Sequence, residues 1–221
     1  MSVNKKILQW LIVILVPVIL ALGAVRFLLT PLFVQIEYRT PNFPNDPYGF
    51  TQDERLKWSQ VALDYLLNNA GIEFLGDLSF DDGSALYNER ELRHMLDVKI
   101  VVEAAMRVFY VSLAVVILLG IWANRADWWW EYRQALSKGG WLTVTLIGVL
   151  IVLMLLSFNV FFVAFHKIFF EGETWIFKYS DTLIRLFPVR FWRDAFITVG
   201  GLTLLGGMLA GYFGGRIKIK N

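Results

Sequence analysis

The chain contains no cysteine and only two histidines among its 221 residues. Without cysteine it has no disulfide framework, no thiol nucleophile and no lipidated cysteine of its own. It also lacks a glycine-rich phosphate loop, a nucleotide motif and a basic nucleic-acid patch, so we expect no cofactor and no nucleic-acid partner. Acid/base chemistry near neutral pH would therefore fall to His94 and His166.

Hydrophobic residues make up 57% of the chain, and its mean hydropathy is +0.53. They gather in four runs, at residues 7–34, 100–123, 141–165 and 195–213. Each run is near or above the ~20 residues that cross a bilayer core as a helix. The first is far longer than the ~7–15-residue core of a signal peptide, so we predict a retained helix. The sequence therefore predicts a multi-pass membrane protein with four spans.

The charged residues between these runs differ in sign from one side to the other. The segment 36–98 holds twelve Asp and Glu residues but only five Lys and Arg residues. Because Lys and Arg collect on the cytoplasmic side, both termini are predicted to be cytoplasmic and both histidines extracellular, in a cell membrane. The basic residues on the predicted cytoplasmic side are Lys5, Lys6, Arg125, Arg133, Lys138, Arg216, Lys218 and Lys220.

The segment between the first two runs is too long and too patterned for a hairpin loop. Thr51 and Glu54 have the spacing of a capping box and predict a helix that ends near residues 69–71. The stretches 72–75 and 78–80 are short and at best strand-like. The predicted fold class is an integral membrane all-α bundle with a small extracellular α+β cap. Its expected parts are transmembrane helices at 1–35, 99–123, 141–165 and 194–221, the last with a basic cytoplasmic tail, the cap at 36–98, a cytoplasmic loop at 124–140 and an extracellular aromatic-rich loop at 166–193.

Both histidines lie where an apolar run meets the extracellular side. His94 precedes the second run, in a helix that Asn88 can cap, and Asp97 at i+3 can orient its imidazole. His166 follows the third run and opens the aromatic-rich loop, which either anchors in the headgroup layer or walls a pocket for acyl chains. The pair is a candidate acid/base site on lipid. The alternative is that each is an amphipathic residue at the membrane interface.

An ordered set of motifs along the chain is similar to a known family. The set is Tyr38-x-x-Pro41-x-Phe43-Pro44-x-Asp46-x-Tyr48-Gly49-Phe50 with Arg55, then His94-x-x-Asp97-Val98, then His166 followed by Trp175 and Asp181-x-Leu183-Ile184-x-x-Phe187-Pro188-x-x-Phe191-Trp192. No single motif is diagnostic, but their order over the whole chain resembles the bacterial lipoprotein intramolecular transacylases, the Lit family.

The resemblance implies a reaction on a bacterial lipoprotein whose N-terminal cysteine carries a diacylglyceryl thioether. The sn-2 acyl chain would move to the α-amine of that cysteine, giving an N-acylated lyso-form lipoprotein. His94 and His166 match the catalytic histidines of the family. We expect His94 to be the base, with Asp97 as its neighbour, and His166 to position the amine or stabilise the oxyanion.

Further residues are expected to support the site or bind substrate, and membrane lipids are expected to surround it. Arg55, Arg93 or a backbone amide could stabilise the tetrahedral oxygen. The complete supporting set is Asp97, Arg55, Arg93, Tyr48, Trp175, Asp181, Phe187 and Trp192.

Two other functions stay open at this point, and a third is disfavoured. A non-catalytic membrane subunit would tolerate replacement of both histidines. A metal-dependent lipid hydrolase could use His94, His166 and Asp97, although such sites usually show closer spacing, and we expect no metal. A transporter would be expected to show internal repeats, and the four unlike runs show none.

Overall fold

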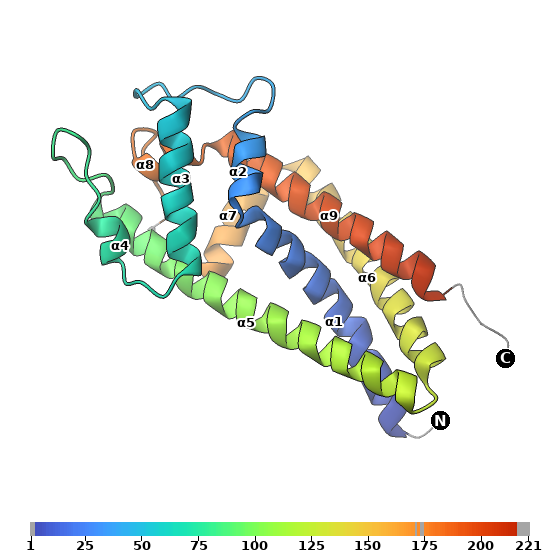
Figure 1. Ribbon diagram of the computed structural model, residues 1–221. Coiled ribbons are helices and arrows are strands. Elements are labelled where there is room, and N and C mark those ends of the chain that lie inside the picture. Colours follow the sequence, from blue (N-terminus) through green and yellow to red (C-terminus); the bar gives the residue numbers. More distant parts are fainter. Residues whose placement is uncertain (1–2, 171, 173–174, 216–221) are drawn as a thin grey trace. The chain divides into compact units, whose positions relative to one another are not determined.

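The computed structural model describes residues 3–170, 172 and 175–215, and this part of the chain is built from helices (Figure 1). The stretch Lys5–Leu28 and three further helices are long and apolar enough to cross a membrane, with hydropathies between 1.6 and 2.7. The prediction of four spanning helices is confirmed. The helices are α1 (Val3–Leu28), α2 (Pro31–Glu37), α3 (Gln52–Leu67), α4 (Glu73–Gly76), α5 (Glu89–Arg125), α6 (Trp129–Leu156), α7 (Phe158–Phe169), α8 (Thr182–Leu186) and α9 (Val189–Gly215).

The first and third apolar runs are each divided between two helices. Pro31 has no N–H to donate and stands at the first position of α2, while the hydroxyl of Thr30 accepts a hydrogen bond from the backbone of Phe33. Ser157 stands between α6 and α7. Its hydroxyl accepts a hydrogen bond from the backbone N–H of Val160 and so caps the start of α7. A continuous apolar run therefore does not mean one continuous helix, because a capping side chain within the run can end one helix and start the next.

The expected α+β cap is wrong, since the described residues contain no strand. The stretch 72–75, expected to be strand-like, instead enters the single turn α4 (Glu73–Gly76). The backbone N–H groups of residues 74–76 bond to carbonyls three or four residues earlier. Ser79 and Ala85 form only an isolated antiparallel bridge. Segments this short carry no hydrophobic periodicity that distinguishes a strand from a helical turn, so tertiary packing decides which of the two forms.

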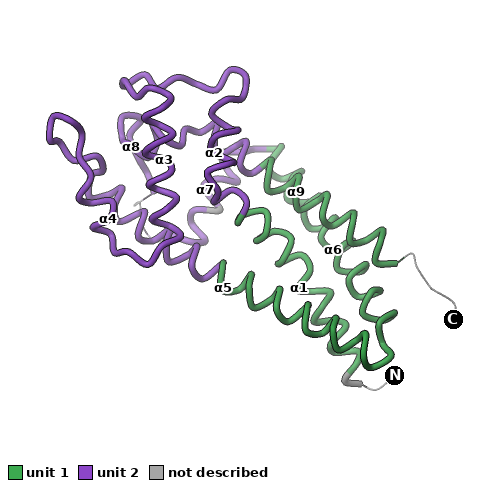
Figure 2. The backbone as a smooth tube through the Cα atoms, in the orientation of Figure 1, with its two compact units in different colours: residues 1–26, 106–156, 197–221 green, residues 27–105, 157–196 purple. Residues whose placement is uncertain are grey.

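The chain divides into two compact units (Figure 2). One comprises residues 27–105 and 157–196 and contains α2, α3, α4, α7 and α8 with the first turns of α5 and α9. Its core is built from side chains that are almost fully buried, and both histidines belong to this unit. Those core residues include Val34, Tyr65, Leu75, Leu86 and Leu186. Thr51 and Glu54 form the predicted capping box at the start of α3.

The other unit comprises residues 1–26, 106–156 and 197–221, and small residues bring its helices together. A Cβ added at Gly140 in α6 would collide with the backbone of Gly207 and Gly211 in α9. Ser137 Oγ donates to the carbonyl of Gly211 at 2.6 Å across the same pair of helices. Lipid offers no hydrophobic drive for helix association, so this close approach is how α6 and α9 gain packing energy.

Replacing Gly140 by Leu should therefore separate α6 from α9, because backbone atoms cannot yield as a flexible side chain can. We expect loss of monodisperse, folded protein in detergent, measured by size-exclusion chromatography and thermal unfolding. Gly148 in the same helix is the matched control, since an added Cβ there meets nothing within 4 Å. Equal stability of Gly140→Leu and Gly148→Leu would contradict the packing described for this unit.

Candidate active site

The first candidate residue, His94, lies in the second turn of α5. Asn88 starts this helix by accepting hydrogen bonds from the backbone N–H groups of Arg90 and Glu91, at 3.0 and 3.1 Å. The Glu91 carboxylate accepts in return from the Asn88 N–H at 2.8 Å, which completes a capping box. The predicted helix start is confirmed, and it leaves His94 only 8% exposed, on the packed face of α5.

The second candidate residue, His166, lies in the last turn of α7. Its Nδ1 is 2.8 Å from the carbonyl oxygen of Phe162, one turn earlier. A carbonyl oxygen only accepts hydrogen bonds, so Nδ1 carries the hydrogen. The neutral ring therefore has its lone pair on Nε2. This is the nitrogen that can accept a proton.

The two imidazole rings lie close together. Their centroids are 6.4 Å apart and their planes differ by 20°. Phe170 contacts both rings, at 5.0 Å from His94 and 5.6 Å from His166. Phe177 lies 5.2 Å from His94, and Trp175 lies 5.0 Å from His166. The aromatic loop after α7 thus places its rings against both imidazoles.

Burial controls the electrostatics of this pair. It lowers the pKa of His166 below its ordinary 6.5, and the hydrogen bond to Phe162 opposes this shift. Nδ1 of His94 is buried and has no hydrogen-bond partner in the described structure, so Asp97 does not orient the ring through that atom as we expected. Phe170 is itself 9% exposed and covers the site with an apolar ring.

The carboxylate of Glu91 joins the aromatic loop to α5. It is 1% exposed and accepts the backbone N–H of Leu183, at the start of α8, at 2.7 Å. Beside it, the hydroxyl of Thr182 donates to the carbonyl of Leu86 at 2.5 Å. Since the loop that carries Trp175 and Phe177 ends at α8, these bonds hold that loop against the helix that carries His94.

Two of the expected supporting residues belong to another part of the same unit. Arg55 is 5% exposed and donates to the carbonyl of Pro44 at 2.7 Å, with its guanidinium over the ring of Tyr38. Tyr48 is half exposed, and its carbonyl accepts from Arg185. Arg185 in turn pairs with the buried Asp46 at 3.0 Å. These groups hold the segment 38–50 on α3 and α8, and the described contacts of Arg55 are with this segment.

Four more of the supporting residues lie in two further places. Arg93 and Asp181 both line a polar pocket at the start of α5. Phe187 and Trp192 pack on Phe191, and Phe187 and Phe191 belong to the buried core of the unit. Of the supporting residues, the structure places Trp175 in ring contact with the histidine pair.

Three aromatic residues that contact the imidazoles are not among the individually expected site residues. Phe170 and Phe177 come from the loop after α7, and Phe162 lies 4.1 Å from His166. A helical spacing of four residues connects Phe162 to His166 and could have identified it. No local spacing connects Phe177 to His94, so that contact depends on the folded chain.

Comparison with known proteins supplies the family. The family described as lipoprotein intramolecular transacylase Lit matches residues 7–192. The chain belongs to the Lit family. An uncharacterised protein of Aquifex aeolicus (strain VF5) is 30% identical over 210 residues, which cover 95% of this chain and 94% of the relative. This chain is therefore an enzyme of the acyltransferase class.

Solved structures of a Lit protein share this fold. The membrane-integral lipoprotein intramolecular transacylase Lit from Bacillus cereus matches with a TM-score of 0.73 and 20% identity, over 95% of this chain and 94% of that one. A variant of that protein with one histidine replaced by arginine matches with a TM-score of 0.71 and 21% identity, over 96% and 90% of the two chains. Together with the four apolar helices, these matches make this Lit family member a multi-pass membrane protein.

Replacing Glu91 by Ala should loosen the aromatic loop and lower stability. The change removes the acceptor of the backbone N–H groups of Asn88 and Leu183, and the loss at the buried Leu183 costs about 1–3 kcal/mol. The matched control is Glu89→Gln, because Glu89 is 91% exposed and its ion pair with Arg93 is worth at most about 1 kcal/mol. Thermal unfolding in detergent measures both variants, and an unchanged midpoint for Glu91→Ala would show that the loop is held by other contacts.

Titration should place the pKa of His166 below 6.5, because burial disfavours its charged form. NMR of the His94→Asn protein, labelled at histidine, follows this single imidazole in micelles. The unfolded chain binds the proton more readily than the folded one, so stability should fall as the pH drops below 6.5. A midpoint at or above 6.5 would contradict the burial described for this ring.

Proposed function

We propose that this enzyme moves the sn-2 acyl chain of a diacylglyceryl lipoprotein to the α-amine of its N-terminal cysteine. The observation that carries the proposal is the pair of imidazoles 6.4 Å apart within an aromatic enclosure, in a member of the Lit family. In this reaction the amine nitrogen forms a bond to the ester carbonyl carbon, and the bond from that carbon to the glyceryl oxygen breaks. One proton leaves nitrogen and one arrives on that oxygen, so no water or cofactor is consumed.

Donor and acceptor belong to the same substrate molecule, so holding them together is much of the work. The transition state is a ring of roughly eight atoms, and its main cost is the loss of conformational freedom. Phe170, Phe177 and Trp175 lie around the two imidazoles and can confine a cysteine-glyceryl headgroup there. The separation of the rings allows both of them to reach one such headgroup.

Proton transfer is the second part of the work, and the hydrogen bonding of the two rings supports a division of it. His166 donates through Nδ1 to Phe162 and presents Nε2 as the lone pair, so we assign it the proton of the attacking amine. His94 then serves the glyceryl oxygen or the tetrahedral oxygen. This reverses our first assignment, which rested on an Asp97 hydrogen bond that Nδ1 of His94 does not make.

We also propose the orientation that the Lys and Arg residues favour, with both termini cytoplasmic and the site at the extracellular face of a bacterial cell membrane. A lipoprotein that bears a diacylglyceryl group in the outer leaflet would then reach the histidines from the membrane. The metal-dependent hydrolase gains no support, because no three His, Asp or Glu side chains of the described residues form a metal-ligand group.

Replacing either His94 or His166 by Asn should reduce transacylation by about 10²- to 10⁴-fold, the usual share of general acid/base catalysis. Lys57→Ala is the control, since that lysine is exposed and packs on the ring of Trp58. The measurement is tandem mass spectrometry of N-terminal lipopeptides from bacteria that express each variant and make diacylated lipoproteins.

Each alternative function leaves its own product in that experiment. Internal transfer keeps the total mass and places an acyl chain on the amine, whereas a hydrolase removes a chain. A non-catalytic subunit changes neither the mass nor the position of the chains. Full activity of both histidine variants would rule out the proposed chemistry.

A further inference from the structure

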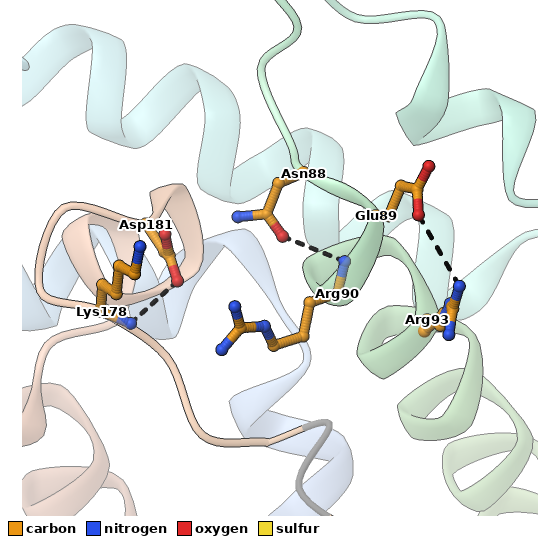
Figure 3. Close-up of a pocket in the computed structure, with 6 residues that line it drawn as sticks. All are labelled: Asn88, Glu89, Arg90, Arg93, Lys178 and Asp181. Carbon is orange, nitrogen blue, oxygen red and sulfur yellow. Dashed lines mark hydrogen bonds and ion pairs between the residues drawn. The ribbon is translucent and has the colours of Figure 1, made fainter.

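A polar pocket of about 540 Å³ opens at the start of α5 (Figure 3). Neither histidine lines it. Four of the lining residues come from the cap and first turns of α5, and two come from the segment before α8, so the whole pocket belongs to one unit. The lining residues are Asn88, Glu89, Arg90, Arg93, Lys178 and Asp181.

The pocket lies beside the histidine site, on the side away from the apolar run of α5. Arg90 precedes His94 by four residues, which is about one helical turn or 5.4 Å. Arg90 Nη1 donates to the carbonyl of Ile176 at 3.0 Å, and the next residue, Phe177, contacts the ring of His94. The same helix and the same loop therefore border both sites.

The peptide chain of the proposed lipoprotein substrate must leave the histidine site on a polar side. The α-amine that reacts between the histidines and the peptide chain belong to the same cysteine, while the acyl chains are apolar. A peptide advances about 3.3–3.6 Å per residue when extended. The second and third residues of the lipoprotein therefore lie within reach of a surface one helical turn from His94.

The charges of the pocket are unevenly matched. Glu89 pairs with Arg93, and the Asp181 carboxylate accepts the backbone N–H of Lys178 at 2.8 Å. Within the described residues, neither the Arg90 guanidinium nor the Lys178 ammonium has a carboxylate within 4 Å. Figure 3 shows Arg90 reaching toward the loop that carries Lys178. Arg90, Arg93 and Lys178 thus line the pocket against the two carboxylates of Glu89 and Asp181, which leaves one excess positive charge. Arg90 and Lys178 have donors for carbonyl or carboxylate oxygens.

We propose that this pocket binds the peptide segment that directly follows the lipid-modified cysteine, and that it favours acidic over basic residues at the second and third positions. The inference rests on the proposed function and adds the part of the substrate that the histidine site does not hold. Arg90 and Lys178 are the residues that set this preference.

The test uses synthetic diacylglyceryl lipopeptides that carry Asp-Asp, Ser-Ser or Lys-Lys after the cysteine. The purified full-length enzyme in zwitterionic micelles should give a kcat/KM about fivefold higher for Asp-Asp than for Lys-Lys, the scale of one or two exposed ion pairs. Lys178→Glu should abolish or reverse this ratio, and Arg90→Lys should retain it. Lys57→Glu is the charge control and should leave the ratio unchanged.

The outcomes of this test distinguish a failure of the peptide-binding inference from a failure of the proposed transacylase function. If Lys178→Glu and Arg90→Glu transacylate the Ser-Ser peptide and keep the wild-type ratio, the inference is wrong and the proposed function stands. If both variants slow all three peptides equally, and the effect follows added phosphatidylglycerol, the pocket binds a lipid headgroup and the inference is also overturned. If the wild-type enzyme acylates the amine of none of the peptides, the proposed function fails as well.

Discussion

The site depends on one buried carboxylate. Glu91 accepts N–H groups from Asn88, at the start of its own helix, and from Leu183, 92 residues further along the chain. A carboxyl group at 1% exposure loses its hydration, and such burial is tolerated only when hydrogen bonds replace that hydration. Two backbone donors supply those bonds. The same bonds that stabilise the carboxylate therefore also fix the end of the aromatic loop beside His94.

The start of this loop is held by the last turn of α7. The backbone N–H of Phe170 bonds to the carbonyl of His166 at 2.8 Å, so the ring that covers both histidines follows directly from the helix that carries one of them. The loop is thus held at its start by the last turn of α7 and at its end by Glu91. A loop anchored at both ends can keep aromatic rings around a flexible substrate without belonging to a regular element.

Local signals in the sequence predicted the helix starts correctly. Thr51 with Glu54, and Asn88 with Glu91, are three residues apart, and their bonds form within a single turn. The bond from Glu91 to Leu183 could not be predicted in this way, because nothing in the spacing of two distant residues indicates contact. The strand assignment at residues 72–75 failed for a related reason. A stretch of four residues satisfies either geometry, and the buried side chain of Leu75 suits a helical turn here.

The site residues divide in the same manner. The positions of His94 and His166 at the ends of two apolar runs indicated a common depth, and the folded chain brings the rings together. By its charge alone, Arg55 was a suitable candidate to stabilise the tetrahedral oxygen. Its guanidinium instead lies over Tyr38 and bonds to Pro44, where it holds an irregular segment that has few backbone bonds of its own. Residue type identifies what a side chain can do, but burial and partners decide which of those tasks it performs.

The two units are packed by different kinds of contact. In one, Gly140 lets α6 approach α9 at backbone distance, which suits helices that gain nothing from hydrophobic association in lipid. In the other, a buried hydrophobic core that includes Tyr65 and Leu86 supports a site with an apolar border and a charged border. An acyl transfer on a lipoprotein needs such a boundary, because the reacting headgroup joins acyl chains to a peptide. Placing His94 between the apolar run of α5 and the cations of its first turns provides that boundary along a single helix.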